Sequence, residues 1–128
     1  MKLLLDTHLL VWVAYDSACL SSRIRSLIND PRHELFFSVA SIWEIGIKFR
    51  AHRAAFATNP SALRGCLLDS GFNEVEITGD QTICASSLPL LHKDPFDRML
   101  VSQAIVNGYT LLTADALLAK YAGPVRRV

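Results

Sequence analysis

Acidic side chains stand at the predicted ends or starts of regular elements in separate parts of this chain, each beside a short apolar run. They are Asp6, Glu44, Asp94, Asp97 and Asp115. Carboxylates that are brought together from different elements repel one another unless a positive charge lies between them. A hard divalent cation, which prefers oxygen ligands, supplies that charge. The residue types and their placement therefore predict a metal-dependent enzyme.

Two of these acids follow predicted strands. Residues 3–5 are entirely apolar, as is typical of a central parallel strand, and Asp6 comes directly after them. Residues 109–112 form another predicted strand, whose exit at residues 113–115 ends in Asp115. Ligand sites of parallel α/β sheets lie at the carboxyl ends of the strands, so both side chains are expected at one site.

Predicted helices position the other acids. A helix over residues 39–52 has apolar side chains around most of its circumference, and Glu44 lies on the narrow polar stripe that remains. A second helix starts with Asp94 as N-cap, Pro95 at N1 and Asp97 at N3. N-capping alone explains Asp94, so its further role stays open.

The remaining pattern alternates strands with helices. Further strands are expected at residues 35–37, 74–77 and 125–128, and further helices at residues 8–15, 21–28, 61–70, 78–87 and 116–121. This alternation predicts a parallel sheet that is covered on both faces. With 128 residues, of which 51% are apolar, the chain is expected to form a single domain over residues 1–128.

Charge and cysteine content narrow the class of protein. The 13 Lys and Arg nearly balance the 12 Asp and Glu, so any polyanion must be met by a local basic patch. Three cysteines without a Cys-x-x-Cys pair argue against a disulfide framework and a zinc knuckle, and they favour a reducing, cytoplasmic setting. No apolar run approaches the ~20 residues of a membrane span, so no membrane association is expected.

Each acid also has a simpler structural interpretation. Asp6 and Asp115 could each cap the helix that follows, and Asp97 suits the positive end of a helix dipole. Glu44 could form an exposed ion pair with Lys48, four residues later on the same helix. Capping alone does not require four acids on separate elements that can all face one crevice. The four acids taken together therefore favour a shared site.

Two histidines near these acids raise the possibility of a softer metal. His8 lies two residues after Asp6, and His92 lies two residues before Asp94. They lack paired spacing and accompany more carboxylates than a zinc site uses. We therefore interpret both as polar loop residues.

Four segments of the chain resemble the acidic motifs of the PIN-domain family. They are Leu4-Leu5-Asp6-Thr7-His8, Trp43-Glu44-Ile45, His92-Lys93-Asp94-Pro95-Phe96-Asp97-Arg98-Met99-Leu100 and Leu111-Leu112-Thr113-Ala114-Asp115. The segments occur in the family's order and cover almost the whole chain. In its length and its Asp-Pro-Phe-Asp-Arg segment the chain is similar to the VapC-type toxins of prokaryotic toxin–antitoxin pairs.

The resemblance implies an α/β fold, a PIN-like three-layer sandwich with a central, mostly parallel sheet of four or five strands flanked by helices. It also implies a Mg²⁺- or Mn²⁺-dependent ribonuclease that is usually dimeric and is inhibited by a VapB-type antitoxin. The family's acidic quartet corresponds by position to Asp6, Glu44, Asp97 and Asp115. Thr113 corresponds to the family's hydroxyl before the last acid, and Asp94 is an additional acid of this subgroup.

One segment departs from the family's pattern. After Lys48 similar proteins often have a Gly-Lys-Leu turn, whereas residues 49–56 here are Phe-Arg-Ala-His-Arg-Ala-Ala-Phe. This region shapes the rim of the groove in the family. The departure therefore bears on substrate choice and on partner contact.

The predicted chemistry is hydrolysis of a phosphodiester by water with Mg²⁺. Asp6, Asp97 and Asp115 are expected to ligate one or two ions, directly or through water. Glu44 is expected to orient or deprotonate the attacking water. Because the 2′-hydroxyl takes no part, the products carry a 5′-phosphate and a 3′-hydroxyl. Single-stranded or looped RNA is the expected substrate, since an A-form duplex hides its bases.

Three other functions are compatible with clustered acids. A structure-specific DNA nuclease would use the same chemistry. A receiver-like regulatory module that binds Mg²⁺ would need paired acids after the first strand and a Lys at a late strand end, and this sequence has neither. A PIN-type scaffold that only binds RNA or protein is disfavoured because all of the acids are present.

Overall fold

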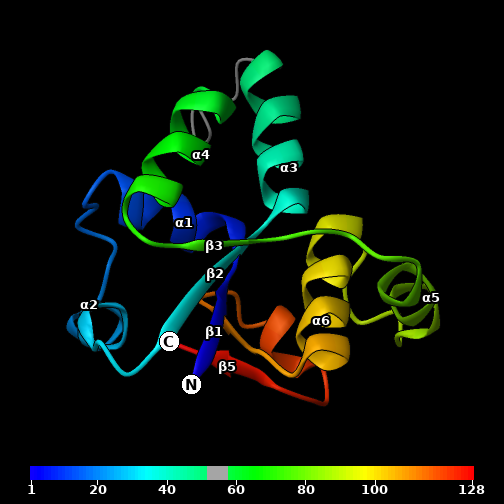
Figure 1. Cartoon of the computed structure of the whole chain (residues 1–128). Helices are drawn as coiled ribbons and strands as arrows, with labels where there is room; N and C mark the ends of the chain where they lie inside the picture. Colours follow the sequence, from blue (N-terminus) through cyan, green and yellow to red (C-terminus); the bar gives the residue numbers. More distant parts are fainter. Residues whose placement is uncertain (52–57) are drawn as a thin grey trace.

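A parallel sheet forms the centre of the structure, a computed structural model that describes residues 1–51 and 58–128 (Figure 1). Within these residues the sheet has five strands in the order β3-β2-β1-β4-β5, and every neighbouring pair is parallel. The strands are β1 (Lys2–Leu5), β2 (Glu34–Ser38), β3 (Asn73–Val75), β4 (Thr110–Thr113) and β5 (Val125–Arg127). The predicted parallel α/β sheet is confirmed.

Helices cover both faces of this sheet. They are α1 (Thr7–Ala14), α2 (Ser22–Asn29), α3 (Val39–Arg50), α4 (Pro60–Asp69), α5 (Gly79–Ser87) and α6 (Pro95–Asn107). Figure 1 shows α1, α2 and α4 on one side of the sheet and α5 and α6 on the other. Among the helices that the structure describes, none has the length and apolar content needed to cross a membrane.

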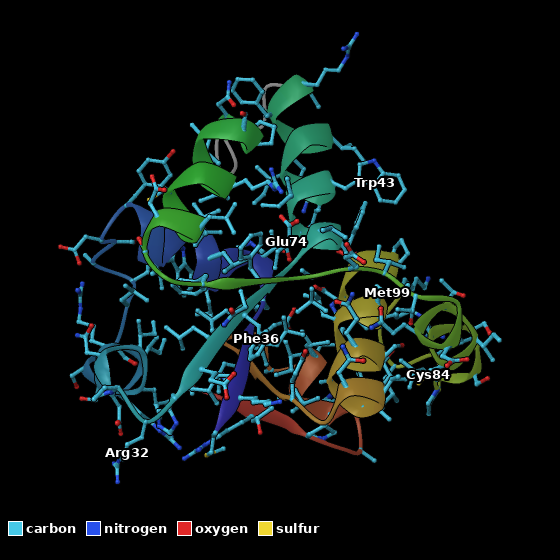
Figure 2. All side chains as sticks on the ribbon, in the orientation of Figure 1. Arg32, Phe36, Trp43, Glu74, Cys84 and Met99 are labelled. Atoms are coloured by element: carbon cyan, nitrogen blue, oxygen red, sulfur yellow. The ribbon has the colours of Figure 1, made fainter. Side chains whose placement is uncertain are left out.

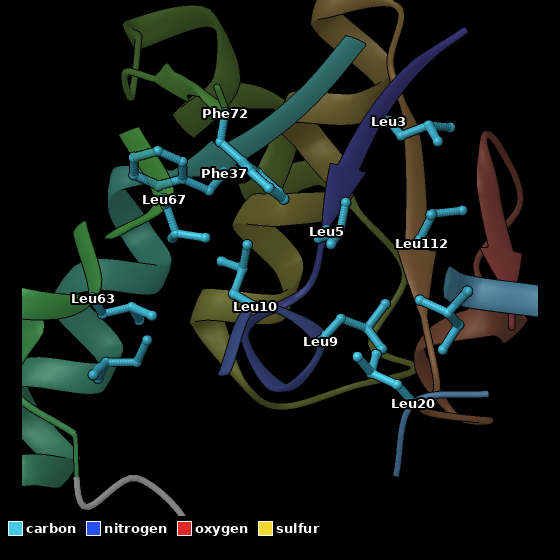
Figure 3. Close-up of a cluster of buried hydrophobic side chains, with 12 residues drawn as sticks. Leu3, Leu5, Leu9, Leu10, Leu20, Phe37, Leu63, Leu67, Phe72 and Leu112 are labelled. Atoms are coloured by element: carbon cyan, nitrogen blue, oxygen red, sulfur yellow. The ribbon is translucent and has the colours of Figure 1, made fainter. Parts of the chain in front are cut away.

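The side chains of β1 show why the protein has three layers. Successive residues of a strand point to opposite faces of a sheet. Leu4 packs on one face with Leu100 of α6 and with Phe36, which is labelled in Figure 2. Leu3 and Leu5 pack on the other face, in the cluster of Figure 3. All three leucines are fully buried, as expected for a central parallel strand.

The order of the strands reverses beside β1. From β1 the chain proceeds outward to β2 and β3, and then returns to place β4 on the other side of β1. Leu5 of β1 lies in register with Leu112 of β4, so Asp6 and Thr113 follow at neighbouring positions. Open parallel sheets bind ligands at such a switch point, outside the carboxyl ends of the strands.

Residues at its two ends determine where α6 begins and ends. Asp94 caps α6 as predicted, because its Oδ1 accepts hydrogen bonds from the backbone N–H groups of Phe96 and Asp97. The helix ends at Gly108, whose φ of 74° lies in the left-handed region that favours glycine. The predicted end of α3 at residue 52 lies outside the described residues, as does most of the departing segment 49–56.

Two predicted elements differ from the structure. The predicted helix over residues 116–121 is wrong, because only a 3₁₀ turn, η2 (Leu118–Lys120), forms before Tyr121 adopts an extended backbone and buries its ring. The strand predicted at residues 74–77 is shifted and shorter. Its partner β2 ends at Ser38, the residue in register with Val75, because Ser38 is also the N-cap of α3.

Candidate active site

Asp6 lies where β1 ends and α1 begins. Its Oδ1 accepts a hydrogen bond from the Leu9 backbone N–H at 2.9 Å, so the simpler interpretation as a helix cap is correct. Its Oδ2 accepts a hydrogen bond from the Thr113 hydroxyl at 2.5 Å. Burial raises the pKa of Asp6, against the opposing effect of these two hydrogen bonds. One oxygen of Asp6 therefore caps α1, while its other oxygen faces β4 and is available for a second role.

Thr113 joins Asp6 to Asp115. While its hydroxyl donates to Asp6, it accepts a hydrogen bond from the Asp115 backbone N–H at 3.0 Å. Asp115 caps the short turn after β4, with Oδ1 2.8 Å from the Leu117 backbone nitrogen. Burial would raise the pKa of Asp115, but hydrogen bonds from the Leu117 N–H and the His92 ring outweigh it and lower this pKa. The hydroxyl of Thr113 therefore links the Asp6 carboxylate after β1 to the backbone of Asp115 after β4.

Asp97 occupies the first turn of α6, and its side chain is only 17% exposed. Two effects raise the pKa of Asp97 to about 8: burial first, and then the negative charges of neighbouring acids. Those neighbours, in decreasing order of effect, are Asp94, Glu44, Asp6 and Asp115. The other four acids of the sequence pattern are thus brought within electrostatic reach of Asp97 at this edge of the sheet.

Glu44 lies on α3 with only 2% of its surface exposed. Its Oε1 accepts a hydrogen bond from the Thr7 hydroxyl at 2.7 Å, and its Oε2 pairs with Lys48 Nζ at 2.5 Å. The ion pair with Lys48 exists, but its acid is buried rather than exposed as the simpler interpretation expects. The polar stripe of α3 faces the interior, whereas Trp43, labelled in Figure 2, is 64% exposed on the outer side.

His92 lies between two of the carboxylates. Its Nε2 is 3.1 Å from Asp97 Oδ2 and 3.3 Å from Asp115 Oδ2. Its Nδ1 accepts a hydrogen bond from the Asp94 backbone N–H at 3.1 Å. A neutral imidazole carries one proton, so this contact assigns the proton to Nε2, which points at the two carboxylates. His92 lies in a loop as predicted, whereas the interpretation of His8 as a loop residue is wrong, because His8 lies in the first turn of α1. The sequence pattern predicts no contact of His92 with the acids; the sequence signal for it is its position just before the Asp94 cap.

The loop that contains His92 is held in place by α6 and by Tyr121. The Tyr121 hydroxyl accepts a hydrogen bond from the His92 backbone N–H at 3.0 Å. The Arg98 guanidinium donates to three backbone carbonyls within residues 85–89 at 2.8–3.0 Å, and to the Tyr121 hydroxyl at 3.2 Å. The Arg that ends the Asp-Pro-Phe-Asp-Arg segment therefore fixes the loop that aims His92.

The arrangement of potential ligand atoms at this site fits a divalent cation. One ligand atom each from His92, Asp97 and Asp115 lies within 4.8 Å of the other two. Asp6 is not part of this group and adjoins it through the Thr113 hydroxyl. Carboxylate oxygens suit Mg²⁺ and Mn²⁺. Burial, and then the repulsion of neighbouring acids, holds the pKa of Asp97 at about 8, and a cation at this position would relieve that repulsion. Because the His92 proton lies on Nε2, the ring is better suited to donate a hydrogen bond to the carboxylates than to bind the metal.

The fold and the site together define a parallel α/β protein with an acidic candidate metal site at its switch point. The chain belongs to the PIN domain family, because the model of that family matches residues 3–124. Among curated proteins none matches the chain significantly.

Solved structures show the same fold at low sequence identity. A chain of VapBC2 from Rickettsia felis, crystallised with a DNA fragment from its promoter, has a TM-score of 0.71 and 13% identity; the match covers 99% of this chain and 98% of that chain. A chain of a toxin–antitoxin complex from Klebsiella pneumoniae has a TM-score of 0.64 and 16% identity, over 96% and 94% of the two chains. At these identities the likeness concerns the fold.

Proposed function

We propose that this chain is a divalent-metal-dependent endoribonuclease of the VapC type, the toxin of a toxin–antitoxin pair. The observation that supports it best is the convergence of acids from β1, β4, α3 and α6 on Asp97, whose pKa is raised to about 8 by burial and then by the negative charges of these acids. Membership of the PIN domain family and a fold shared with chains of two toxin–antitoxin structures add to this support.

Asp6, Asp97 and Asp115 are the proposed ligands of Mg²⁺ or Mn²⁺. The bound ion would neutralise charge on the phosphate and lower the pKa of a water molecule. His92, through its Nε2 proton, positions the carboxylates of Asp97 and Asp115. The protein contributes a rigid set of oxygens, so little rearrangement is needed when the ion and the substrate bind.

Three further residues have proposed roles around these ligands. Glu44 orients or deprotonates the attacking water, using the lone pairs that its contacts with Thr7 and Lys48 leave available. Thr113 fixes the relative position of Asp6 and Asp115 through its hydroxyl. Asp94 caps α6 and adds negative charge beside Asp97.

The proposed substrate is single-stranded or looped RNA, cut to leave a 5′-phosphate and a 3′-hydroxyl. The proposal includes a cytoplasmic homodimer, inhibited by a VapB-type antitoxin. These features rest on the family resemblance. A cleft with several carboxylates also suits inhibition by an inserted Arg, which pairs with carboxylates through two parallel hydrogen bonds.

Matched RNA and DNA oligonucleotides test the proposal. Purified protein should cut the RNA with Mg²⁺ or Mn²⁺ and should not cut it in EDTA. Asp6→Asn should abolish cleavage and leave RNA binding largely intact, because the change removes one charge and keeps the helix cap. Preferential cleavage of DNA would instead indicate a structure-specific DNA nuclease. RNA binding without cleavage by the unsubstituted protein would indicate a scaffold.

A further inference from the structure

A cavity of about 200 Å³ opens beside the acidic residues. It is lined by Asp6, His8, Trp12, Ala114 and Asp115. Two of these residues are proposed metal ligands, and a third, Ala114, lies between Thr113 and Asp115. The two ring side chains, His8 and Trp12, have no part in the proposed chemistry.

The two rings are presented by α1 at a fixed position relative to the acids. His8 and Trp12 are four residues apart, so they lie on the same face of the helix. Their ring centroids are 6.3 Å apart, with an angle of 61° between the ring planes. Trp12 is partly buried against the core cluster that includes Leu9 and Leu10. Because Asp6 caps α1, the carboxylate and the indole are held by the same short helix.

We propose that this cavity is a base-binding subsite, in which a nucleobase of the RNA next to the scissile phosphate stacks on the indole of Trp12 while His8 borders it. The proposal rests on the nuclease function above and adds a base contact to the same site. A phosphate bound at the proposed metal site would have a nucleoside attached to it, and the cavity shares Asp6 and Asp115 with that site.

The size and lining of the cavity support a single base. Its volume is below the roughly 300–1,000 Å³ of pockets for drug-sized ligands, so it suits one flat ring system. Stacking on an aromatic side chain contributes about 1–3 kcal/mol per base and accepts every base, since each has a π-face. The subsite therefore adds affinity and fixes the position of the strand without specifying one base.

Tryptophan fluorescence can observe this contact directly. The chain has two tryptophans, and Trp43 is 64% exposed on α3, where it contacts Phe96 outside this cavity. Trp43→Phe leaves Trp12 as the sole tryptophan, and Asp97→Asn, which does not line the cavity, prevents cleavage during the titration. RNA oligonucleotides should quench the Trp12 emission. An abasic nucleotide at one position should remove the quenching and weaken binding about 5- to 150-fold.

Cleavage kinetics with two matched variants provide a second test. Trp12→Phe keeps an aromatic face, whereas Trp12→Leu keeps an apolar side chain without one. Trp12→Leu should raise KM more than it lowers kcat, and Trp12→Phe should restore most of the loss. Thermal unfolding of each variant checks that it folds. If Trp12→Leu does not fold, the fluorescence experiment still decides the question, because the protein used in that experiment keeps Trp12.

The outcomes separate this subsite from the proposed function. If RNA binds, as measured by anisotropy of a labelled strand, but Trp12 emission does not change and no abasic position weakens binding, the subsite is refuted even when cleavage is observed. If Trp12 emission is quenched but the unsubstituted protein does not cut RNA, the subsite stands and the nuclease function fails. Absence of any RNA binding would overturn both.

Discussion

Metal binding should compete with a proton on Asp97. In the metal-free protein, burial and neighbouring acids raise the pKa of Asp97 to about 8, so its carboxyl group is mostly protonated at neutral pH. A carboxyl group must be deprotonated to ligate a metal. Lowering the pH should therefore weaken the binding of Mn²⁺ well above the range in which an ordinary Asp titrates.

The size of this effect follows from the pKa. With a pKa of about 8, Asp97 is about 90% protonated at pH 7, so binding one Mn²⁺ should release about 0.9 proton. Relative to pH 9, the apparent dissociation constant should be about tenfold higher at pH 7 and about a hundredfold higher at pH 6. Burial also raises the pKa of Asp6, which acts in the same direction.

Isothermal titration calorimetry with Mn²⁺ measures both quantities when it is repeated between pH 6 and 9 in buffers of different ionisation enthalpy. Asp94→Asn is the matched control: Asn is an equally good N-cap, but it removes the neighbouring charge with the largest effect on Asp97. The variant should therefore shift the pH dependence to lower pH. An affinity that stays constant from pH 6 to 8, or an unchanged profile in Asp94→Asn, would refute this reasoning.

Three further predictions concern stability, measured by urea denaturation. The pKa of Asp97 is raised in the folded state, so its contribution to the free energy of unfolding is complete below about pH 4 and is lost as pH rises towards 8. This loss is on the order of several kcal/mol, and the Asp97→Asn variant in EDTA should show a smaller loss. An equal pH dependence in both proteins would contradict it. Thr113→Val should cost about 1–3 kcal/mol because the buried Asp6 loses a donor, and Thr113→Ser should cost less. Gly108→Ala should cost about 1 kcal/mol because of its positive φ, and no loss would show that the backbone relaxes.

The elements with local signals could be predicted from the sequence. The apolar run of β1, the Ser21 cap of α2 and the Asp94 cap of α6 depend on neighbouring residues, and the structure shows each of them. The two misplaced elements depend on distant partners. β3 ends where β2 stops pairing with it, and the turn before β5 is set by burial of the Tyr121 ring.

The acidic site, too, could be predicted from the sequence only in part. Its carboxylates could be proposed from their places beside predicted strands and helix starts, although their metal-binding roles remain predictions. The orientation of α3 could not be derived, since a polar stripe ordinarily faces solvent, whereas Glu44 is buried and Trp43 is exposed. The contact of His92 depends on Tyr121 and Arg98, which hold its loop from elsewhere in the fold.

The end groups of cleaved RNA test the central claim most directly, namely that the acids at the β1 and β4 ends hold a dication that hydrolyses RNA. Cleavage with Mg²⁺ or Mn²⁺ should leave a 5′-phosphate and a 3′-hydroxyl, and it should be absent in EDTA. A 2′,3′-cyclic phosphate on the products, or cleavage that continues unchanged in EDTA, would contradict the account.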